Sequence, residues 1–294
     1  MLNLAASKQN TILKVIATLA ELQSSLTPLK TSGLKIALVP TMGALHQGHL
    51  SLIAEAQKLA DIVVCSIFVN PTQFTDPKDL EKYPRPLEHD IKMLTEAGCN
   101  FVFMPSVKEM YPGYPTPEHW KIDLGEAEFV LEGEFRKGHY QGVTQIVHKL
   151  FDAVKPDVAM FGQKDFQQVL MIKNMVKVLG LEVQIAVCPI IREADGLAMS
   201  SRNIHLSQSD REHALVLSKA LFYIEINYNR LEIDQLLKEA KAMINTIPEV
   251  ELDYLTIANG DTLLPITEKT HQNTVALVAA KVGQTRLIDN VIIK

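Results

Sequence analysis

Short apolar runs alternate with helical patterns between Lys35 and Ile191 of this 294-residue chain. The runs predict strands at 36–39, 62–69, 101–103, 157–161 and 183–187, and the patterns between them predict helices at 49–60, 86–97, 140–154 and 165–179. Strands that alternate with helices pair in parallel, and helices then cover both faces of the sheet. The order therefore predicts an α/β fold with a doubly wound, Rossmann-like parallel sheet, whose ligands bind beyond the carboxyl ends of its strands.

The alternation of predicted strands and helices ends near residue 190. Helical patterns follow at 208–226 and 233–245, and strand-like runs follow at 252–258, 274–281 and 285–289, the last two resembling a hairpin that turns near Gly283. We therefore expect two domains, a Rossmann-like domain over residues 1–190 and a smaller α+β domain over residues 191–294. At the other end, Leu2–Leu29 has the pattern of an amphipathic helix and not that of a signal segment.

Composition excludes several classes of protein. The chain is 47% hydrophobic and 21% charged, with a net charge of −5 and a pI near 6.0, and no basic block suggests a nucleic-acid partner. The longest apolar runs, Ile62–Val69 and Val275–Ala280, are too short to cross a bilayer. Cys65, Cys99 and Cys188 are odd in number and widely spaced, as expected of reduced thiols in a cytoplasmic protein.

The stretch at residues 36–49, IALVPTMGALHQGH, carries the strongest chemical signal. Its apolar run breaks at Pro40 and turns through Gly43, and His46 and His49 then open the next helix. Unpaired backbone N–H groups and the positive end of the helix dipole favour phosphate at such a point. The alternatives are a metal site, for which no third ligand is evident, and a pair made of one capping and one core histidine.

A second group of polar residues, GQKD, follows the strand predicted at 157–161. Gly162 would let a ligand approach the backbone, and Lys164 could place an ammonium beside a phosphate. Asp165 either contacts the ligand or only caps the next helix. Gln168 lies one turn further on, on the same helix face.

A third group lies at the predicted domain boundary, in the stretch READGLAMSSRN at residues 192–203. Ser200, Ser201 and Arg202 offer two small donors and a fixed cation. They could bind a polyphosphate from the opposite side of a cleft, although an ordinary turn would have the same composition.

A fourth group follows the strand predicted at 62–69. Asn70 and Gln73 are uncharged amides, suited to a small molecule that carries hydroxyl and carboxylate groups, or simply to turn chemistry around Pro71. The stretch at residues 70–86 is long for a βα connection and is either a lid or a surface loop.

Taken in this order, the segments resemble the pantothenate synthetase (pantoate–β-alanine ligase) family, within the His-x-Gly-His nucleotidyltransferase-like superfamily. The resemblance rests on VPTMGALHQGH, SIFVNPTQF, YPR, LEGEFRKGHYQGV, GQKD and READGLAMSSRN, and it covers most of residues 30–205. It implies a homodimer that joins pantoate to β-alanine through a pantoyl adenylate, uses ATP with Mg²⁺, and releases AMP and pyrophosphate. It also implies that the small C-terminal domain closes over the ATP site.

The resemblance implies roles for individual residues. Catalysis would fall to His46, His49, Lys164 and Arg202, with His49 as proton donor. The ATP site would comprise Met42, Gly43, Ala44, Leu45, His46, Gln47, Gly48, His49, Gly162, Gln163, Lys164, Asp165, Ile191, Met199, Ser200, Ser201 and Arg202. Gln73 and Gln168 would hold pantoate, Gln73 would also contact β-alanine, and Asp90 would help to place Mg²⁺.

Three positions depart from the family pattern. Gln47 and Gln163 stand where the family usually has Glu, and Phe166 stands where it often has Tyr. Two rival functions remain open at this point: another small-molecule nucleotidyltransferase of the same superfamily, and a non-catalytic nucleotide-binding module. A small aminoacyl-tRNA synthetase is disfavoured because the chain is acidic and has no basic region for tRNA.

Overall fold

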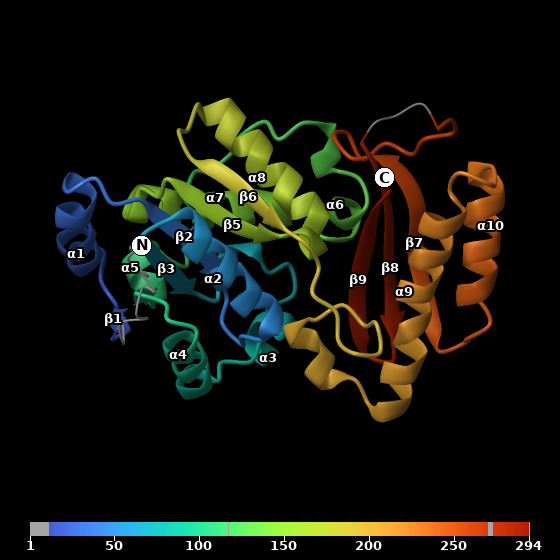
Figure 1. The fold of residues 1–294 in the computed structure, drawn as a ribbon, viewed down its shortest axis with the longest axis horizontal. Coiled ribbons are helices and arrows are strands. Elements are labelled where there is room, and N and C mark those ends of the chain that lie inside the picture. The colour runs from blue at the N-terminus through green and yellow to red at the C-terminus, as the bar shows by residue number, and fades with distance from the viewer. Residues whose placement is uncertain (1–11, 117, 270–272, 294) are drawn as a thin grey trace, which may run out of the picture.

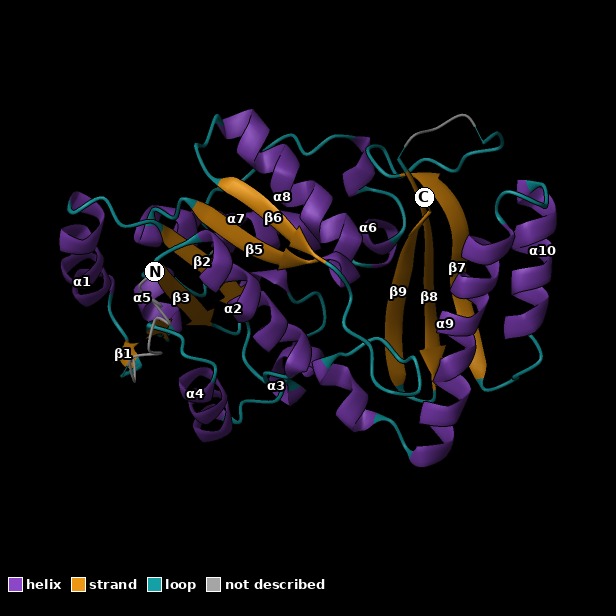
Figure 2. Cartoon of the chain, in the orientation of Figure 1, coloured by secondary structure: helices purple, strands orange, loops and turns teal. Residues whose placement is uncertain are grey.

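The computed structural model describes residues 12–116, 118–269 and 273–293, and it contains two separate sheets (Figures 1 and 2). The first is a six-stranded parallel sheet in the order β1-β4-β3-β2-β5-β6. Its strands are β1 (Lys14–Ile16), β2 (Ile36–Thr41), β3 (Ile62–Ile67), β4 (Phe101–Phe103), β5 (Val158–Gly162) and β6 (Gln184–Cys188). The predicted doubly wound fold is therefore confirmed.

Helices connect these strands. They are α1 (Leu19–Thr31), α2 (Gln47–Leu59), α3 (Pro77–Lys82), α4 (Leu87–Glu96), α5 (Val107–Met110), α6 (Glu132–Phe135), α7 (His139–Val154) and α8 (Phe166–Leu179), with 3-10 turns η1 (Pro71–Gln73), η2 (Glu126–Glu128) and η3 (Gln163–Asp165). Each long expected helix in this region is present, with ends shifted by one or two residues.

Successive residues of the central strand β2 enter two different cores. Ile36 and Leu38 pack in the core that also contains residues of α1, α7 and α8, whereas Ala37 and Val39 pack with residues of α2 and α4. Side chains alternate between the faces of a strand, so a strand covered on both faces must be apolar throughout. This requirement explains why β2, β3 and β5 were recognisable as continuous apolar runs.

The strand order reverses at β2. After β2 the chain adds β3 and β4 on one side, where β1 is the edge strand, and then β5 and β6 on the other. Connections leave in opposite directions at such a point, which opens a crevice beyond the carboxyl ends of the two central strands. The segments after β2 and β5 are the two that carry the histidines and the GQKD sequence.

The second sheet is antiparallel and lies in the C-terminal part of the chain. It consists of β7 (Val250–Asn259), β8 (Thr274–Val282) and β9 (Thr285–Ile293), and it follows the 3-10 turn η4 (Ser201–His205) and the helices α9 (Gln208–Asn227) and α10 (Ile233–Ile244). Figure 1 shows α9 and α10 together on one side of this sheet. The expected smaller α+β unit with its terminal hairpin is thus present.

Strand β8 joins the two halves of the molecule. Ala276, Val278 and Ala280 pack in the core with α9 and α10, whereas Val275 and Leu277 belong to the same core as α7 and α8 of the large sheet. Both faces of the small sheet are therefore covered, one by its own helices and one by the N-terminal part of the chain.

Two expectations need correction. Strand β2 does not break at Pro40 but continues to Thr41, because its pairing with β5 ends at Leu38 and leaves one side of the strand unpaired there. The helix expected over Leu2–Leu29 starts only at Leu19, after β1, and residues 1–11 lie outside the described part. The stretch at 70–86, expected as a lid or a surface loop, contains η1 and α3.

Within the described ranges, no helix is both long and apolar enough to cross a membrane.

Candidate active site

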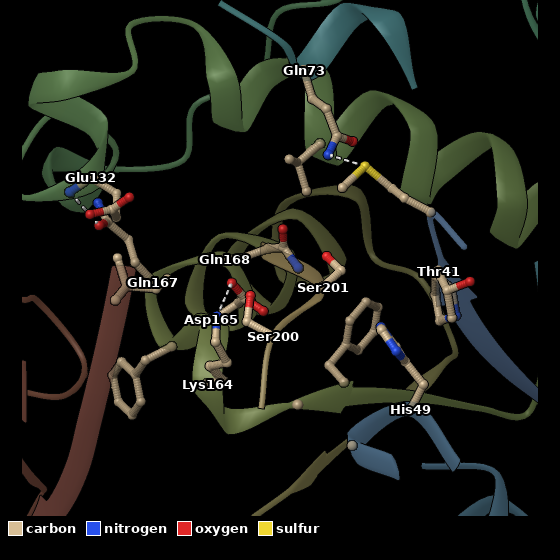
Figure 3. Close-up of a pocket in the computed structure, with 18 of the residues that line it drawn as sticks. Thr41, His49, Gln73, Glu132, Lys164, Asp165, Gln167, Gln168, Ser200 and Ser201 are labelled. Carbon is tan, nitrogen blue, oxygen red and sulfur yellow. Dashed lines mark hydrogen bonds and ion pairs between the residues drawn. The ribbon is translucent and has the colours of Figure 1, made fainter. Parts of the chain in front are cut away.

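A cavity of about 240 Å³ lies where the crevice of the large sheet meets the small sheet. Residues from the ends of β2, β3 and β5, from α7 and α8, and from β7 and β9 line it. Figure 3 shows His49 and Thr41 on the right, Gln73 at the top, and Lys164, Gln168 and Ser200 together to the left of the histidine. Segments that are far apart in the sequence therefore meet in one cavity.

The two histidines after β2 cap helix α2 and also line the cavity. Nδ1 of His46 accepts a hydrogen bond from the Gly48 N–H at 3.1 Å, and Nδ1 of His49 accepts one from the His46 N–H at 3.3 Å. A ring nitrogen that accepts carries no hydrogen, so both neutral rings hold their proton on Nε2. The expected set of free backbone donors is wrong in this respect, because the histidines occupy the Gly48 and His46 amides.

Both imidazoles are neutral in the free protein. Burial lowers the pKa of His46 to about 4, and the Lys164 ammonium adds to the effect. Burial also lowers the pKa of His49 to about 3, with a further contribution from His46, whose ring centre is 4.1 Å away. The pair therefore offers two neutral N–H donors, which suit phosphate oxygens, and not two positive charges.

The glycine at position 48 leaves room for the ring of His46. A Cβ there would lie 2.8 Å from Cε1 of His46. The capping ring thus occupies the space that any side chain would need, which explains the glycine between the two histidines.

The loop between β2 and α2 is held from behind by Asp90 of α4. Its carboxylate accepts hydrogen bonds at 2.8 Å from the backbone N–H groups of Ala44 and Leu45, and Ala44 has a positive φ of 50°. Asp90 does not line the active-site cavity but a second, more apolar one behind the loop, which Gly43 also lines. That Asp90 helps to place Mg²⁺ stays a prediction. In the structure Asp90 holds the loop through these two hydrogen bonds.

The GQKD segment forms the turn η3 after β5. Lys164 is largely buried beside the cavity, with its Nζ 3.9 Å from the Asp165 carboxylate. Asp165 makes no side-chain cap to α8, so the capping interpretation is wrong and the half-exposed carboxylate faces the cavity. A Cβ on Gly162 would meet nothing within 4 Å, so space for a ligand lies directly over this residue.

Gln163 serves a different purpose from its neighbours. Its amide donates to Asn290 of β9 at 3.1 Å, and Asn290 donates in return to the backbone oxygens of Gln163 and Lys164 at 3.0 Å. A Glu at position 163 could not donate to Asn290 in this way. The departure from the family pattern at this position therefore contributes a contact between the two sheets.

Arg202 approaches the cavity from η4. Its guanidinium contacts the carboxylate of Asp79 in α3 at 3.2 Å, and the hydroxyls of Ser201 and Tyr83 lie 3.3 Å apart. The stretch at 70–86 thus packs against the Ser-Ser-Arg segment and forms one wall of the site. An anionic ligand would compete with Asp79 for Arg202.

The two predicted substrate amides both line the cavity. Gln73 is buried, and its Nε2 contacts the sulfur of Met42 at 3.0 Å (Figure 3). A thioether is a weak acceptor, so an oxygen of a substrate would readily replace it. Gln168 projects from the first turn of α8 toward the same space.

Sequence reasoning assigned no role to several other residues that line the cavity. Arg136 is the most notable, because its half-buried guanidinium makes no hydrogen bond or ion pair within the described ranges. Burial and the nearby Arg202 lower its pKa. His139 is oriented by its Nδ1, 2.7 Å from the carbonyl oxygen of Gln73, and burial lowers its pKa to about 3. The stretch GEFRKGH contained both residues, but nothing in its spacing indicated which element would bring them to the site.

Most of the predicted site residues meet in this cavity. Those that line it are Met42, His46, Gly48, His49, Gln73, Gly162, Lys164, Asp165, Gln168, Ile191, Met199, Ser200, Ser201 and Arg202. Gly43, Ala44, Leu45, Gln47 and Gln163 do not line it. The three loop residues support the β2–α2 turn, Gln47 is exposed, and Gln163 contacts β9.

Comparison with known proteins supports one family. The family model for pantoate-beta-alanine ligase matches residues 14–292. Pantothenate synthetase from Acetivibrio thermocellus is 48% identical over 96% of this chain and 100% of its own length, and that from Bacteroides fragilis is 44% identical over 95% and 98%. The crystal structure of pantothenate synthetase from Thermus thermophilus matches with a TM-score of 0.88 at 39% identity, over 95% of this chain and 98% of that one. Pantoate-beta-alanine ligase from Francisella tularensis, complexed with beta-gamma ATP and beta-alanine, matches with a TM-score of 0.77 at 33% identity, over 96% and 98%.

Proposed function

This chain belongs to the pantoate-β-alanine ligase family, and we propose that the cavity between its two sheets is where it joins pantoate to β-alanine at the expense of ATP. The reaction passes through a pantoyl adenylate and releases AMP and pyrophosphate. The observation that carries the proposal is that one cavity combines phosphate-binding groups with neutral amides. The first set includes His46, His49 and Lys164, and the second consists of Gln73 and Gln168.

The chemistry requires both kinds of group. A carboxylate does not react with an amine at neutral pH, because its oxygen is a poor leaving group. An oxygen of the pantoate carboxylate attacks the α-phosphorus of ATP, and the bond from that phosphorus to the bridging oxygen of pyrophosphate breaks. The amine of β-alanine then attacks the acyl carbon, and AMP leaves.

Negative charge grows on the α-phosphate and on the bridging oxygen during the first step. The Nε2–H groups of His46 and His49 and the ammonium of Lys164 converge from the ends of β2 and β5 to hold it. Fixed donors in a partly desolvated cavity stabilise such charge without reorganisation, so positioning and electrostatics supply most of the rate. The neutral state of His49 makes it a hydrogen-bond donor in the free enzyme, and it becomes a proton donor only if bound phosphates raise its pKa.

Two arginines complete the set of cations. Arg202 would exchange its contact with Asp79 for a phosphate. The guanidinium of Arg136 makes no hydrogen bond or ion pair with the described residues, and it suits an anionic group of a substrate. Gln73 and Gln168 would bind the oxygens of pantoate, and Gln73 also β-alanine.

Mg²⁺ would enter the site with ATP. No cluster of three or more metal-binding side chains occurs among the residues that the structure describes, and Mg²⁺ in such enzymes is held largely by phosphates and water. Asp165 is a carboxylate that lines the cavity, whereas Asp90 is engaged with the loop amides. The ion would neutralise charge on the phosphates.

Three further features belong to the proposal. The domain boundary lies near residue 190, with residues 191–294 closing over ATP, because Ile191 and Met199–Arg202 line the cavity together with Asn290 of β9. The stretch at 70–86 would shield the water-sensitive adenylate. We also infer a cytoplasmic homodimer, on the family resemblance and on three buried cysteines that form no disulfide.

Isotope exchange tests the proposal. With ATP, Mg²⁺ and pantoate but no β-alanine, labelled pyrophosphate should exchange into ATP. Lys164→Ala should slow exchange on the order of 10²–10³-fold, because one donor to the developing charge is lost. Its melting curve should match that of the wild type, since Nζ makes only a 3.9 Å contact with Asp165.

Exchange that requires β-alanine, or that proceeds without pantoate, would contradict the adenylate mechanism. It would favour another nucleotidyltransferase, which analysis of the products would identify. Binding of ATP with no pyrophosphate release under any condition would favour a non-catalytic module.

A further inference from the structure

A buried set of hydrogen bonds holds Gln73 in the wall of the cavity, and its last member, Tyr111, does not line the cavity. It runs from the hydroxyl of Tyr111 through the side chain of Asn70 to the amide of Gln73. We propose that Tyr111 is a positioning residue: through Asn70 it fixes the orientation of the Gln73 amide, so that Gln73 presents an N–H group to an oxygen of pantoate. The inference rests on the proposed role of Gln73 in pantoate binding.

The orientation of Asn70 follows from its partners. Its Nδ2 is 3.1 Å from the carbonyl oxygen of Gly142, which can only accept, so the amino group must lie on this side. Its Oδ1 therefore lies on the other side, where it accepts from the Tyr111 hydroxyl at 2.9 Å and from the Thr72 hydroxyl at 3.1 Å. Asn70 is 1% exposed, and all four of its hydrogen-bonding positions are used.

The orientation of Asn70 determines that of Gln73. The second N–H of Asn70 points to Oε1 of Gln73 at 3.1 Å. This contact turns Nε2 of Gln73 toward the cavity, where Met42 is its partner in the structure. An amide turned the other way would present an acceptor to the cavity and would repel the carboxylate oxygens of a hydroxy acid, which can only accept.

Tyr111 is built to hold this arrangement. It follows α5, is 3% exposed, and does not line the cavity. Its ring packs near Phe68 with 6.2 Å between ring centres, and Nζ of Lys149 lies 5.0 Å from the centre of the ring. Burial raises the pKa of its hydroxyl to about 12, so the group remains a donor. The hydroxyl also lies 3.3 Å from the hydroxyl of Thr72, which itself donates to Asn70, so its effect on a ligand passes through Asn70 directly or by way of Thr72.

Tyr111→Phe removes the hydroxyl and keeps the packed ring. We expect the Kd of pantoate, measured by calorimetric titration, to rise roughly 5- to 30-fold, as for the loss of one buried hydrogen bond, while the Kd of ATP stays unchanged. Tyr228→Phe is the matched control. Tyr228 is buried in the core of the small sheet, and its hydroxyl has no hydrogen-bond partner among the described residues.

A double-mutant cycle separates positioning from a general structural effect. If Tyr111 acts through Gln73, Tyr111→Phe should not weaken pantoate further in a Gln73→Ala background. An equal loss in both backgrounds, equal losses for pantoate and ATP, or no loss from Tyr111→Phe alone would overturn the inference. If Gln73→Ala itself leaves pantoate affinity unchanged, the proposed function of Gln73 fails, and the inference fails with it.

Discussion

Replacement of Arg286 by Met should destabilise the protein far more than loss of an ordinary ion pair. Arg286 of β9 contacts both carboxylate oxygens of Glu132 in α6, at 2.6 and 2.8 Å. Its Nε also contacts Asp253 of β7 at 2.7 Å, and the hydroxyl of Tyr254 donates to Glu132 at 3.0 Å. This cluster joins the small sheet to the helix that precedes Arg136.

The expected magnitude follows from burial. The Glu132 side chain is 7% exposed, so Arg286→Met leaves a carboxylate that water scarcely reaches and whose one remaining hydrogen-bond partner among the described residues is Tyr254. Breaking such a pair typically costs 3–5 kcal/mol. We expect about 3 kcal/mol, at the lower end of this range, because the Arg286 side chain itself is 28% exposed. With a urea m-value of about 3 kcal/mol/M, the unfolding midpoint should fall by about 1 M.

Urea unfolding followed by circular dichroism would measure the effect. Arg211→Met is the matched control, because its pairs with Glu193 and Asp195 are about one-third exposed and should contribute less than about 1 kcal/mol. Adding Glu132→Gln to Arg286→Met should restore part of the lost stability, because no buried charge is then left unpaired. Equal midpoints for the Arg286 and Arg211 variants, or a double variant less stable than Arg286→Met, would refute the reasoning.

Two further predictions concern the fold around the site. In the folded protein the pKa values of His49 and His139 are about 3, whereas that of a histidine in the unfolded chain is 6.5. The unfolded state therefore binds more protons between these two values, so the free energy of unfolding should fall as the pH is lowered from about 7 to about 5. The drop in urea midpoint should be smaller for His139→Asn, and an equal drop would count against this explanation. A Cβ at position 142 would lie 2.3 Å from the Thr72 oxygen, so Gly142→Ala should lower stability by about 1–3 kcal/mol and weaken pantoate binding. Gly162→Ala is the control for stability, because its Cβ would meet open space. Equal melting temperatures for the two variants would show that η1, which contains Thr72, moves away from the new Cβ at little cost.

The identity of the site could largely be predicted from the sequence. His46, His49 and Lys164 follow strands β2 and β5, and the carboxyl ends of parallel strands meet at one edge of the sheet. Local motifs with a strand before them and a helix after them therefore predict a place in the fold as well as a chemistry. The same local rule could not reveal Arg136, because α6 follows a long irregular connection with no periodic pattern.

The roles of individual groups needed the contacts themselves. The family resemblance implied that Asp90 helps to place Mg²⁺, which stays a prediction, and only the structure reveals that its oxygens accept hydrogen bonds from the amides of Ala44 and Leu45. Gln163 lies between two residues of the site and yet faces β9. Neighbours in a turn point in different directions, and sequence order does not indicate which of them faces the ligand.

The sequence by itself determined the doubly wound sheet, the smaller α+β unit in the C-terminal part of the chain, and the segments predicted to carry the chemistry. These properties depend on local periodicity and on turn residues, which act over a few positions. The tertiary structure alone decided which way the Gln73 amide faces and how Arg286 joins the small sheet to α6. The first depends on Tyr111, 41 positions from Asn70, and the second on a partner 154 positions away, and both are brought into contact by packing that no short stretch of sequence specifies.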